Sequence, residues 1–337
     1  MLALTLTQKK SPAQLVERPD PQPSPGEVIV ELAAAALNRR DYWVTQGKYP
    51  GIEVPVILGS DGAGRVSTCG DGVDAAWLGR DVIIDPGLDW GDDPSAQSAN
   101  YNILGMPRDG TFAPLVAVPA TQLHDRPEHL SMTEAAALPL AGVTAYRALF
   151  TQGQLQSGQR ILITGIGGGV AGFALQFAAA AGAEVWVTSS SSEKIRRAVA
   201  LGAQGGFDYT DEAWTKKMEA DAGAPNLIID SAGGPGYASL IDIAKPGGRI
   251  VNYGATVGPP DRLDLFKMFW KQLHLVGSTM GSPEDFTAML RFVSEKQIIP
   301  IIDSVRPLAE GAEALQQMSA SPQFGKYVLS MEQDRHP

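Results

Sequence analysis

The sequence RILITGIGGGVAGFALQFAAAAG, at residues 160–182, contains the pattern that decides the fold. Apolar residues 161–163 predict a buried strand, the glycines that begin at Gly165 predict a tight turn, and Phe173 and Phe177 follow at helical spacing. Glycine is useful in such a turn because bare N–H groups at a helix N-terminus can approach a pyrophosphate closely. The segment therefore predicts the strand, turn and helix that begin a dinucleotide-binding βαβ unit.

The segments after residue 159 alternate between apolar strands and helical stretches. We predict strands at 160–164, 184–188, 226–230, 249–253 and 274–278. Such alternation is typical of a parallel sheet that is covered by helices on both faces. A helix at 283–296 and apolar runs at 298–302 and 327–329 complete the chain.

Residues 28–121 show a different pattern, with short apolar runs between Gly and Pro residues. The runs at 28–32, 56–58, 66–68, 82–84 and 112–118 predict a small antiparallel β-rich unit. Residues 85–110 indicate a solvated surface loop, although its carboxylates could also bind a hard cation. Ser131 and Glu134 fit a capping box that opens a helix toward residue 150, with a kink expected at Pro139.

Length and charge limit the class of protein. A chain of 337 residues favours two domains, and 37 glycines indicate many tight turns. A net charge of -10 without a Lys/Arg cluster argues against a nucleic acid partner. No stretch approaches about 18 consecutive apolar residues and no secretion signal is evident, so we expect a cytoplasmic protein outside the membrane. Cys69 is the single cysteine, which excludes an intrachain disulfide.

The end of the second strand in the βαβ unit bears on the choice of cofactor. NAD-binding proteins usually have an acidic residue there, which accepts hydrogen bonds from the ribose hydroxyls. This chain has Thr188, Ser189 and Ser190, and Lys194 follows. Without a carboxylate to repel it, a 2′-phosphate is tolerated, and hydroxyl and ammonium groups can bind it. NADPH is therefore the predicted cofactor; the alternative is that Ser190 and Glu193 cap the next helix and Lys194 is solvated.

Four stretches together resemble the medium-chain dehydrogenase/reductase superfamily, and most of all its zinc-free quinone oxidoreductase branch. They are the β-rich first part, the glycine turn at 165–172, DGTFAP at 109–114 and FGKYVL at 324–329. The resemblance implies an α/β fold with two domains. Residues 1–130 and 284–337 would form a GroES-like β-rich catalytic domain, and residues 131–283 a Rossmann domain with a doubly wound parallel sheet.

Zinc-containing members of this superfamily carry metal ligands in three segments. They have a Cys where this chain has Asn38, a His-Glu pair where it has Ser60 and Asp61, and another Cys near Leu140. Residues 85–110 lie where zinc relatives have a lobe with four cysteines, and this segment contains no thiol. Because zinc prefers thiolate and imidazole ligands, the resemblance implies that both the catalytic and the structural zinc are absent.

The resemblance also implies individual cofactor contacts. In the glycine turn and the strand that follows, the predicted cofactor-binding residues are Gly165, Ile166, Gly167, Gly168, Gly169, Val170, Ser189, Ser190 and Lys194. Further contacts are implied at Thr144, Tyr209, Gly254, Ala255, Ser278, Thr279, Met280 and Lys326. Tyr209 would lie against the adenosine phosphate, and residues 278–280 would reach the nicotinamide.

Hydride transfer to a carbonyl or conjugated alkene builds negative charge on oxygen, and a site without zinc must stabilise that charge with hydrogen-bond donors. Family position favours Asn38 and Tyr49 as substrate-facing catalytic residues. Asp41 could orient a donor or the nicotinamide ribose, or could equally make a structural hydrogen bond. Tyr42 and Trp43 are predicted to bind substrate, with core packing as an equal alternative.

Together these features predict an NADPH-dependent oxidoreductase that transfers hydride to a quinone or an activated carbonyl compound without zinc. Quinones and enones delocalise the arriving charge and so need less electrophilic help than a saturated ketone. The alternatives are an enoyl-thioester reductase, a zinc-free alcohol dehydrogenase-like enzyme, and a non-catalytic NADPH-binding redox sensor. An enoyl-thioester reductase should bind a CoA-like tail through a basic cluster, which the sequence does not show, and Arg39 and Arg40 are the remaining candidates. The resemblance further implies a homodimer that pairs along the strand at 274–278.

Overall fold

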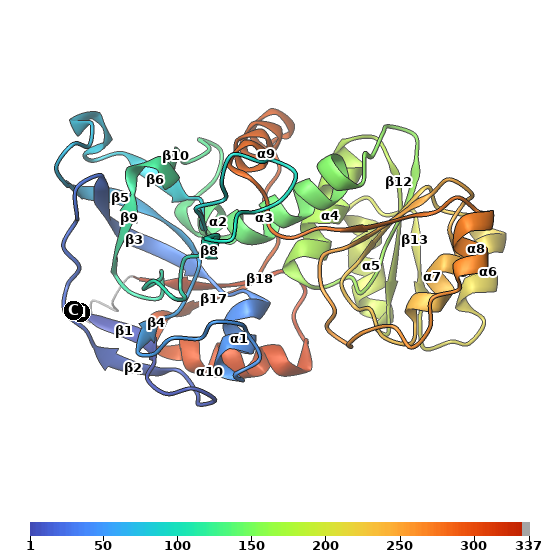
Figure 1. Ribbon diagram of the computed structural model, residues 1–337, viewed down its shortest axis with the longest axis horizontal. Helices are drawn as coiled ribbons and strands as arrows, with labels where there is room; N and C mark the ends of the chain where they lie inside the picture. Colours follow the sequence, from blue (N-terminus) through green and yellow to red (C-terminus); the bar gives the residue numbers. More distant parts are fainter. Residues whose placement is uncertain (332–337) are drawn as a thin grey trace. The chain divides into compact units, whose positions relative to one another are not determined.

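The computed structural model describes residues 1–331 and divides into two compact units. Unit 1 contains Met1–Ala141 and the chain from Ser282 onward, and unit 2 contains Gly142–Gly281. In Figure 1, unit 1 is drawn mainly in blue, cyan and red, and unit 2 in green to orange. The predicted boundary between residues 130 and 131 precedes α2 (Met132–Ala137), which packs against strands of unit 1 and belongs with it.

Unit 1 contains two main sheets that are largely antiparallel. The larger has the strand order β10-β6-β5-β3-β18-β17, with β9 also paired to β3, and the smaller has the order β2-β1-β4. Strand β18 pairs with β3 antiparallel and with β17 in parallel, so Lys326–Ser330 is built into the same sheet as strands from the first part of the chain. The strands are β1 (Leu2–Leu6), β2 (Gln14–Glu17), β3 (Glu27–Ala36), β4 (Val56–Ile57), β5 (Asp61–Cys69), β6 (Asp81–Ile84), β7 (Gly87–Leu88), β8 (Asn102–Ile103), β9 (Leu115–Pro119), β10 (Leu123–Asp125), β17 (Ile302–Pro307) and β18 (Lys326–Ser330).

The predicted capping box at Ser131 is confirmed. Its hydroxyl accepts a hydrogen bond from the Glu134 N–H, and the Glu134 carboxylate accepts one from the Ser131 N–H at 2.7 Å. Helix α2 ends at Ala137 and α3 (Pro139–Tyr146) begins at Pro139, so the expected kink is a break between two helices. Helix α3 begins in unit 1 and continues into unit 2, because the boundary falls between Ala141 and Gly142. The helices that lie wholly in unit 1, besides α2, are α1 (Arg39–Thr45), α9 (Pro283–Lys296) and α10 (Gly311–Gln317).

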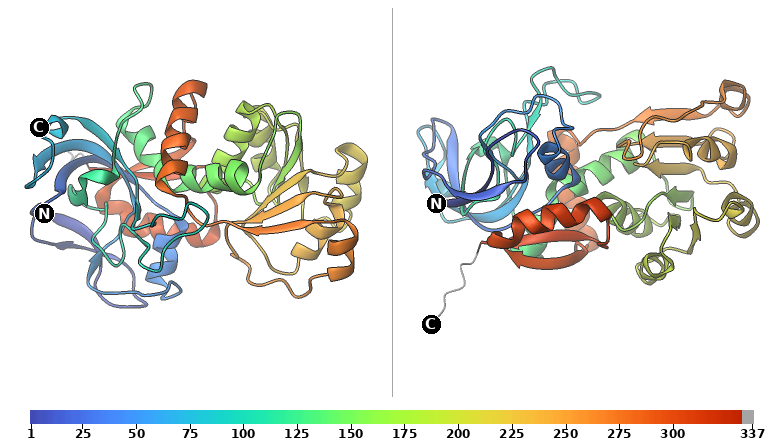
Figure 2. Two further views of the ribbon diagram at one scale, coloured as in Figure 1. Left: turned by 45° about the horizontal axis from the view of Figure 1, so that its top comes forward. Right: turned by 90° about the horizontal axis from the view of Figure 1, so that it is seen from below.

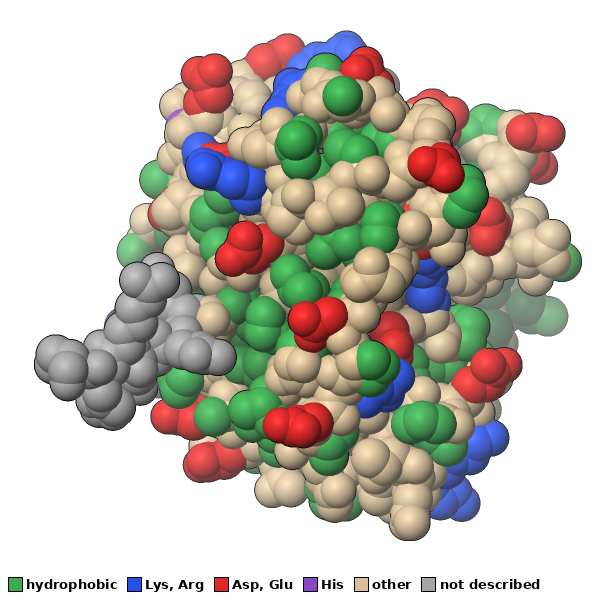
Figure 3. All heavy atoms as spheres, turned by 90° about the vertical axis from the view of Figure 1, so that its left-hand side faces the viewer, with side chains coloured by type: hydrophobic (Ala, Val, Ile, Leu, Met, Phe, Trp, Pro, Cys, Tyr) green, Lys and Arg blue, Asp and Glu red, His purple; other side chains and the backbone are tan. Residues whose placement is uncertain are grey.

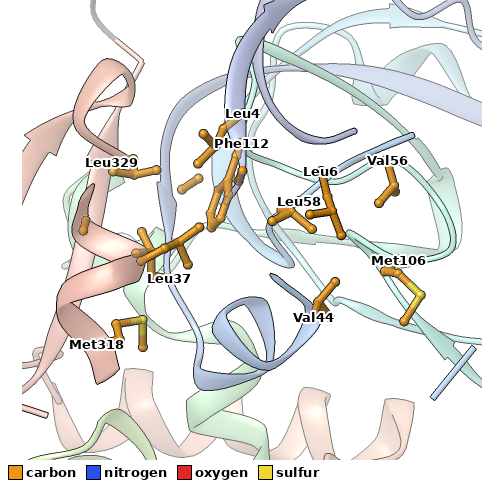
Figure 4. Close-up of a cluster of buried hydrophobic side chains, with 14 of the residues drawn as sticks. Leu4, Leu6, Leu37, Val44, Val56, Leu58, Met106, Phe112, Met318 and Leu329 are labelled. Carbon is orange, nitrogen blue, oxygen red and sulfur yellow. The ribbon is translucent and has the colours of Figure 1, made fainter. Parts of the chain in front are cut away.

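A buried cluster of aliphatic side chains and Phe112 forms the core beneath β1 and β4. Figure 4 shows its members side by side, among them Leu4, Leu6, Leu37, Val44, Val56, Leu58, Met106, Phe112, Met318 and Leu329. Gly59 has a φ of 95°, and a Cβ there would lie 2.4 Å from the Phe112 ring. Because only glycine fits at 59, the core fixes the direction in which the chain continues into Ser60 and Asp61.

Unit 2 contains one fully parallel sheet with the order β13-β12-β11-β14-β15-β16 (Figure 2). The order runs outward from β11 in both directions, so right-handed crossovers place helices on both faces. The five strands predicted for this part are confirmed. The strands are β11 (Arg160–Ile163), β12 (Glu184–Ser189), β13 (Gly205–Asp208), β14 (Leu227–Asp230), β15 (Arg249–Asn252) and β16 (His274–Gly277). The helices are α4 (Gly169–Ala180), α5 (Ser192–Ala200), α6 (Trp214–Asp221), α7 (Tyr237–Ile243) and α8 (Leu265–Trp270).

One face of the molecule carries mixed charge. On the face drawn in Figure 3, Lys and Arg side chains are scattered among Asp and Glu and do not join into one basic surface. Within residues 1–331, every helix is too short or too polar to span a lipid bilayer.

Candidate functional site

The predicted cofactor residues of unit 2 lie at the carboxyl ends of its strands. They follow or close successive strands: the turn 165–170 after β11, Ser189 and Ser190 at β12, Tyr209 after β13, Gly254 and Ala255 after β15, and Ser278, Thr279 and Met280 after β16. Because the strands are parallel, their carboxyl ends share one edge of the sheet. Sheets of this kind bind dinucleotides at that edge.

Glycine occurs at several positions in the turn between β11 and α4 for different physical reasons. Gly165 and Gly167 have φ angles of 63° and 128°, which favour glycine for the backbone alone. Gly168 is the N-cap of α4 with a φ of -74°, and a Cβ there would meet nothing within 4 Å. Neither backbone strain nor packing requires a glycine at 168. The close approach of a ligand to the helix N-terminus would explain it.

The turn is held in place by the neighbouring strands. The Gly165 N–H donates to Thr188 Oγ1 at 3.2 Å. Below it, the buried Asp230 carboxylate accepts hydrogen bonds from Thr164 Oγ1 at 2.6 Å and Asn252 Nδ2 at 3.0 Å. These bonds join β11, β14 and β15 at their carboxyl ends. Sequence reasoning missed Asp230, although an acidic residue at the end of a predicted buried strand was a usable signal.

The adenosine end of the predicted site contains a pair of hydroxyl groups. Tyr209 Oη donates to Ser190 Oγ at 3.2 Å, so the structure brings together two predicted phosphate contacts that are 19 residues apart. The alternative that Ser190 and Glu193 cap the next helix is wrong. Ser191 is the N-cap of α5, and its hydroxyl accepts the Lys194 N–H at 3.3 Å. Ser190 therefore has no capping role, and Lys194 lies in the first turn of α5.

At the nicotinamide end of the predicted cofactor site, a residue of α3 contacts the segment after β16. Thr144 Oγ1 lies 3.8 Å from Met280 Sδ, although the two residues are 136 positions apart. The Ser278 hydroxyl is buried and has no hydrogen-bond partner among residues 1–331. Three further predicted contacts are exposed at this edge: Gly254, Ala255 and Thr279. A glycine turn with open space above it and an unpartnered buried hydroxyl fit a bound dinucleotide.

In unit 1, the predicted catalytic residue Asn38 belongs to a buried polar cluster. Lys326 Nζ donates to Asn38 Oδ1 at 2.6 Å and to Asp61 Oδ2 at 2.9 Å. Asn38 Nδ2 donates to Ser60 Oγ at 3.3 Å, and the Leu140 N–H donates to Asp61 Oδ1 at 2.9 Å. Asp61 was not among the predicted site residues. Its partner Lys326 lies 265 residues away, and no local sequence pattern joins them.

Asp41 lies in the first turn of α1 and makes the contacts of a helix cap. Its Oδ2 accepts a hydrogen bond from the Asn38 N–H at 2.8 Å, and Arg40 Nη1 lies 3.6 Å from Oδ1. Complete burial raises the pKa of Asp41 to about 6, and the nearby Arg40 opposes this rise. The hydrogen bond from the Asn38 N–H thus supports a structural role for Asp41. A catalytic role for Asp41 stays a prediction.

The three aromatic candidates lie in and just after α1. Tyr42 and Trp43 are half-buried, and their ring centroids are 5.2 Å apart. The Arg40 guanidinium lies over the Tyr49 ring, 5.1 Å from its centroid. Tyr49 also lines an open cavity of about 490 Å³ together with Lys9, Lys10 and Glu53. Tyr49 is therefore a candidate that borders a space large enough for a small ligand.

The residues at the three zinc-ligand segments do not fit a zinc ion. They provide an amide, a hydroxyl and a carboxylate, and an ammonium group already contacts both the amide and the carboxylate. Zinc in proteins prefers thiolate and imidazole ligands. In the part of the chain that the structure describes, no three His, Cys, Asp or Glu side chains form a group suited to a metal ion.

Two family profiles match separate parts of the chain. Residues 24–128 match the family described as "Alcohol dehydrogenase GroES-like domain", and residues 169–295 match the family described as "Zinc-binding dehydrogenase". The first match falls within unit 1 and the second falls mainly within unit 2. Both agree with the predicted pairing of a GroES-like domain and a Rossmann domain.

Whole proteins are also similar to this chain. It is 38% identical to the zinc-type alcohol dehydrogenase-like protein YogA of Leptosphaeria maculans, over 97% of this chain and 99% of that protein. It is 29% identical to the acryloyl-coenzyme A reductase of Sulfurisphaera tokodaii, over 98% of this chain and 99% of that protein. The solved structure of an NAD-dependent alcohol dehydrogenase is similar with a TM-score of 0.93 and 35% identity, over 98% of this chain and 100% of that one.

The geometry at Gly168 generates a direct test of the dinucleotide site. We expect Gly168→Ala to raise the dissociation constant of NADPH and NADH about tenfold or more, because the added methyl group occupies the space above the helix N-terminus. The melting temperature should stay the same or rise, since alanine restricts the unfolded chain. Fluorescence titration and thermal unfolding measure the two effects.

The matched control is Gly236→Ala. Gly236 is the N-cap of α7 with a φ of -65° and no neighbour within 4 Å of a built Cβ, and it is not a predicted contact. An unchanged affinity in Gly168→Ala, or an equal loss in both variants, would contradict the assignment.

Proposed function

The chain belongs to the medium-chain dehydrogenase/reductase superfamily, and we propose that it transfers hydride from NADPH to a quinone or a conjugated carbonyl compound without zinc. Its relatives include dehydrogenases and reductases, so it is an oxidoreductase. The observation that carries the finer proposal is the Asn38 amide. In the segment where zinc relatives have a cysteine ligand, it provides a neutral hydrogen-bond donor.

The chemistry follows from the charge that develops during the reaction. Bound NADPH would supply the hydride. The carbonyl oxygen of the substrate gains negative charge and needs a donor close by. The Asn38 amide and the Tyr49 hydroxyl are the donors that we assign to this oxygen. Neutral hydrogen-bond donors suffice for a quinone or enone because conjugation spreads the charge. A saturated ketone would need a group in the enzyme that stabilises the negative oxygen more strongly, such as a metal ion.

The preference for NADPH rests on the end of β12. That strand ends in Thr188 and Ser189, and the exposed Ser190 follows with its hydroxyl bonded to Tyr209. No carboxylate closes the strand, and Lys194 lies in the first turn of α5. Hydroxyl groups and an ammonium suit a 2′-phosphate. A similar structure is described as NAD-dependent, so NADH is the comparison that matters.

A second candidate substrate is an enoyl thioester of coenzyme A, which is the substrate class named for the acryloyl-coenzyme A reductases. The predicted basic pair is not available for it: Arg39 Nη1 donates to the Met318 carbonyl at 2.6 Å, and Arg40 Nη1 to the Leu104 carbonyl at 3.0 Å. The cavity beside Tyr49 instead contains Lys9 and Lys10. Two ammonium groups against the single carboxylate of Glu53 leave a net positive charge at this cavity, which favours an anionic tail.

We also propose a homodimer that pairs along β16. This strand is at the end of its sheet and pairs with β15 alone among the described strands. An open strand edge is a ready template for a second copy of itself. Helix α8 precedes β16 and exposes four apolar side chains, each 62% to 73% accessible: Leu265, Phe266, Phe269 and Trp270. Burial of such side chains would favour association.

A substrate panel tests the proposed reaction. We expect NADPH oxidation with a naphthoquinone or an enal, little with a saturated ketone, and no effect of a metal chelator on the rate.

The panel includes one enoyl group carried on coenzyme A and on N-acetylcysteamine. If the thioester candidate is correct, the coenzyme A form is preferred, and Lys9→Ala/Lys10→Ala reduces that preference about tenfold. Lys296→Ala, an exposed lysine at the end of α9, is the control. No oxidation with any compound would refute the proposal.

Cofactor choice is tested separately. We expect wild-type protein to bind NADPH more tightly than NADH, and Lys194→Ala to reduce the difference about tenfold by removing a phosphate contact. The affinity for NADH, which lacks the 2′-phosphate, should not change. Isothermal titration measures all four constants. Equal affinities that the substitution leaves unaltered would show that the assignment is wrong.

Light scattering tests the proposed homodimer. Wild-type protein should have twice the mass of the 35.7 kDa chain, and Phe266→Ser/Trp270→Ser should shift it toward the mass of one chain. Val199→Ser changes another exposed apolar residue of unit 2 and should have no effect. A single-chain mass for the wild type at micromolar concentration would overturn the proposal.

A further inference from the structure

Lys326 has an unusual position for a lysine. It is the first residue of β18, it is 4% exposed, and its ammonium lies between Asn38 Oδ1 and Asp61 Oδ2. Asp61 is fully buried, and its other oxygen accepts the Leu140 N–H. A buried ammonium and carboxylate of this kind add little net stability, because both lose their hydration. Their value lies in fixing the groups around them.

The group that Lys326 fixes is the amide of Asn38. An ammonium can only donate hydrogen bonds, so the carbonyl oxygen of the amide must face Lys326. The Nδ2 atom therefore takes the opposite side, where one of its two N–H groups bonds Ser60 Oγ at 3.3 Å. The second N–H has no acceptor among the described residues. The Asn38 side chain also faces the Asp41 N–H in the capping box of α1, but no hydrogen bond forms there, so Lys326 provides the hydrogen bond that holds the amide oxygen. Without Lys326, the amide could turn over and present an oxygen, which would repel a negatively charged substrate oxygen.

We propose that Lys326 is the positioning residue of the reaction: it holds the Asn38 amide so that an N–H faces the substrate oxygen. The inference rests on the proposed function, in which Asn38 donates to that oxygen. It gives Lys326 a role that differs from the cofactor contact implied by family resemblance. Asp61 completes the arrangement by neutralising the ammonium and holding it in place.

A double-mutant cycle on the best substrate of the panel separates the two roles. Asn38→Ala should lower kcat about 100-fold, as expected for loss of one oxyanion donor, and Lys326→Met should lower it at least about tenfold. The double variant should be no slower than Asn38→Ala, because Lys326 acts through that amide. The dissociation constant of NADPH should not change. Losses that multiply, or a weaker affinity for NADPH, would overturn the proposal.

Two further variants protect the test against a folding failure. Lys326→Met leaves the Asp61 charge buried alone, so Asp61→Asn/Lys326→Met removes both charges and keeps an acceptor for the Leu140 N–H. It should show the same loss of kcat. Asn38→Asp keeps the contact with Lys326 but removes the donor, and it should be as slow as Asn38→Ala. Normal turnover in either variant would overturn the proposal.

A measurement that needs no turnover tests the contact itself. The chain has five asparagines, so selective ¹⁵N labelling gives a simple set of side-chain amide signals, and Asn38→Ala identifies the one from Asn38. We expect Lys326→Met to shift that signal and Lys296→Met to leave it unchanged. An unshifted signal would overturn the role of Lys326. A shifted signal in a protein that turns over nothing in the panel would support the contact and refute the proposed function.

Discussion

The ion pair between Lys326 and Asp61 constrains the whole of unit 1. Neither charge can be buried without the other, so β18 must lie where its first residue meets the start of β5. Gly59 turns the chain against Phe112 so that Asp61 faces inward, and the Leu140 N–H at the start of α3 binds the second carboxylate oxygen. Segments from the beginning, middle and end of the chain thus meet at one pair of charges.

Unit 2 depends on a different constraint, the parallel direction of its strands. Because every strand ends at the same edge, the strand pairing of the sheet alone brings the glycine turn, the hydroxyl groups at the end of β12 and the segment after β16 to that edge. This separates two kinds of chemistry. We assign the dinucleotide site to unit 2, and to unit 1 the residues that contact one class of acceptor.

Sequence reasoning succeeded where the signal is local. The strands that flank the glycine turn and the cap at Ser131 are confirmed because hydrophobic spacing and capping chemistry decide them. Strand β13 was missed because Gly205 and Gly206 lack the side chains that mark a strand. The cap of α5 was misplaced by one residue because four consecutive serines are chemically equivalent caps. Asp61 was considered only as the replacement of a zinc ligand, and its ion pair with Lys326 could not be predicted because the two residues are 265 positions apart.

The glycines at the start of α4 also bear on the free energy of unfolding of the protein. A glycine in place of alanine lowers stability by roughly 0.5–1 kcal/mol, because the unfolded chain keeps more freedom. A dinucleotide at a hundred times its dissociation constant would return about 2.7 kcal/mol. Resistance to proteolysis with and without NADPH would measure this difference. The abundance of the protein would then follow the total concentration of the dinucleotide, in its oxidised and reduced forms together.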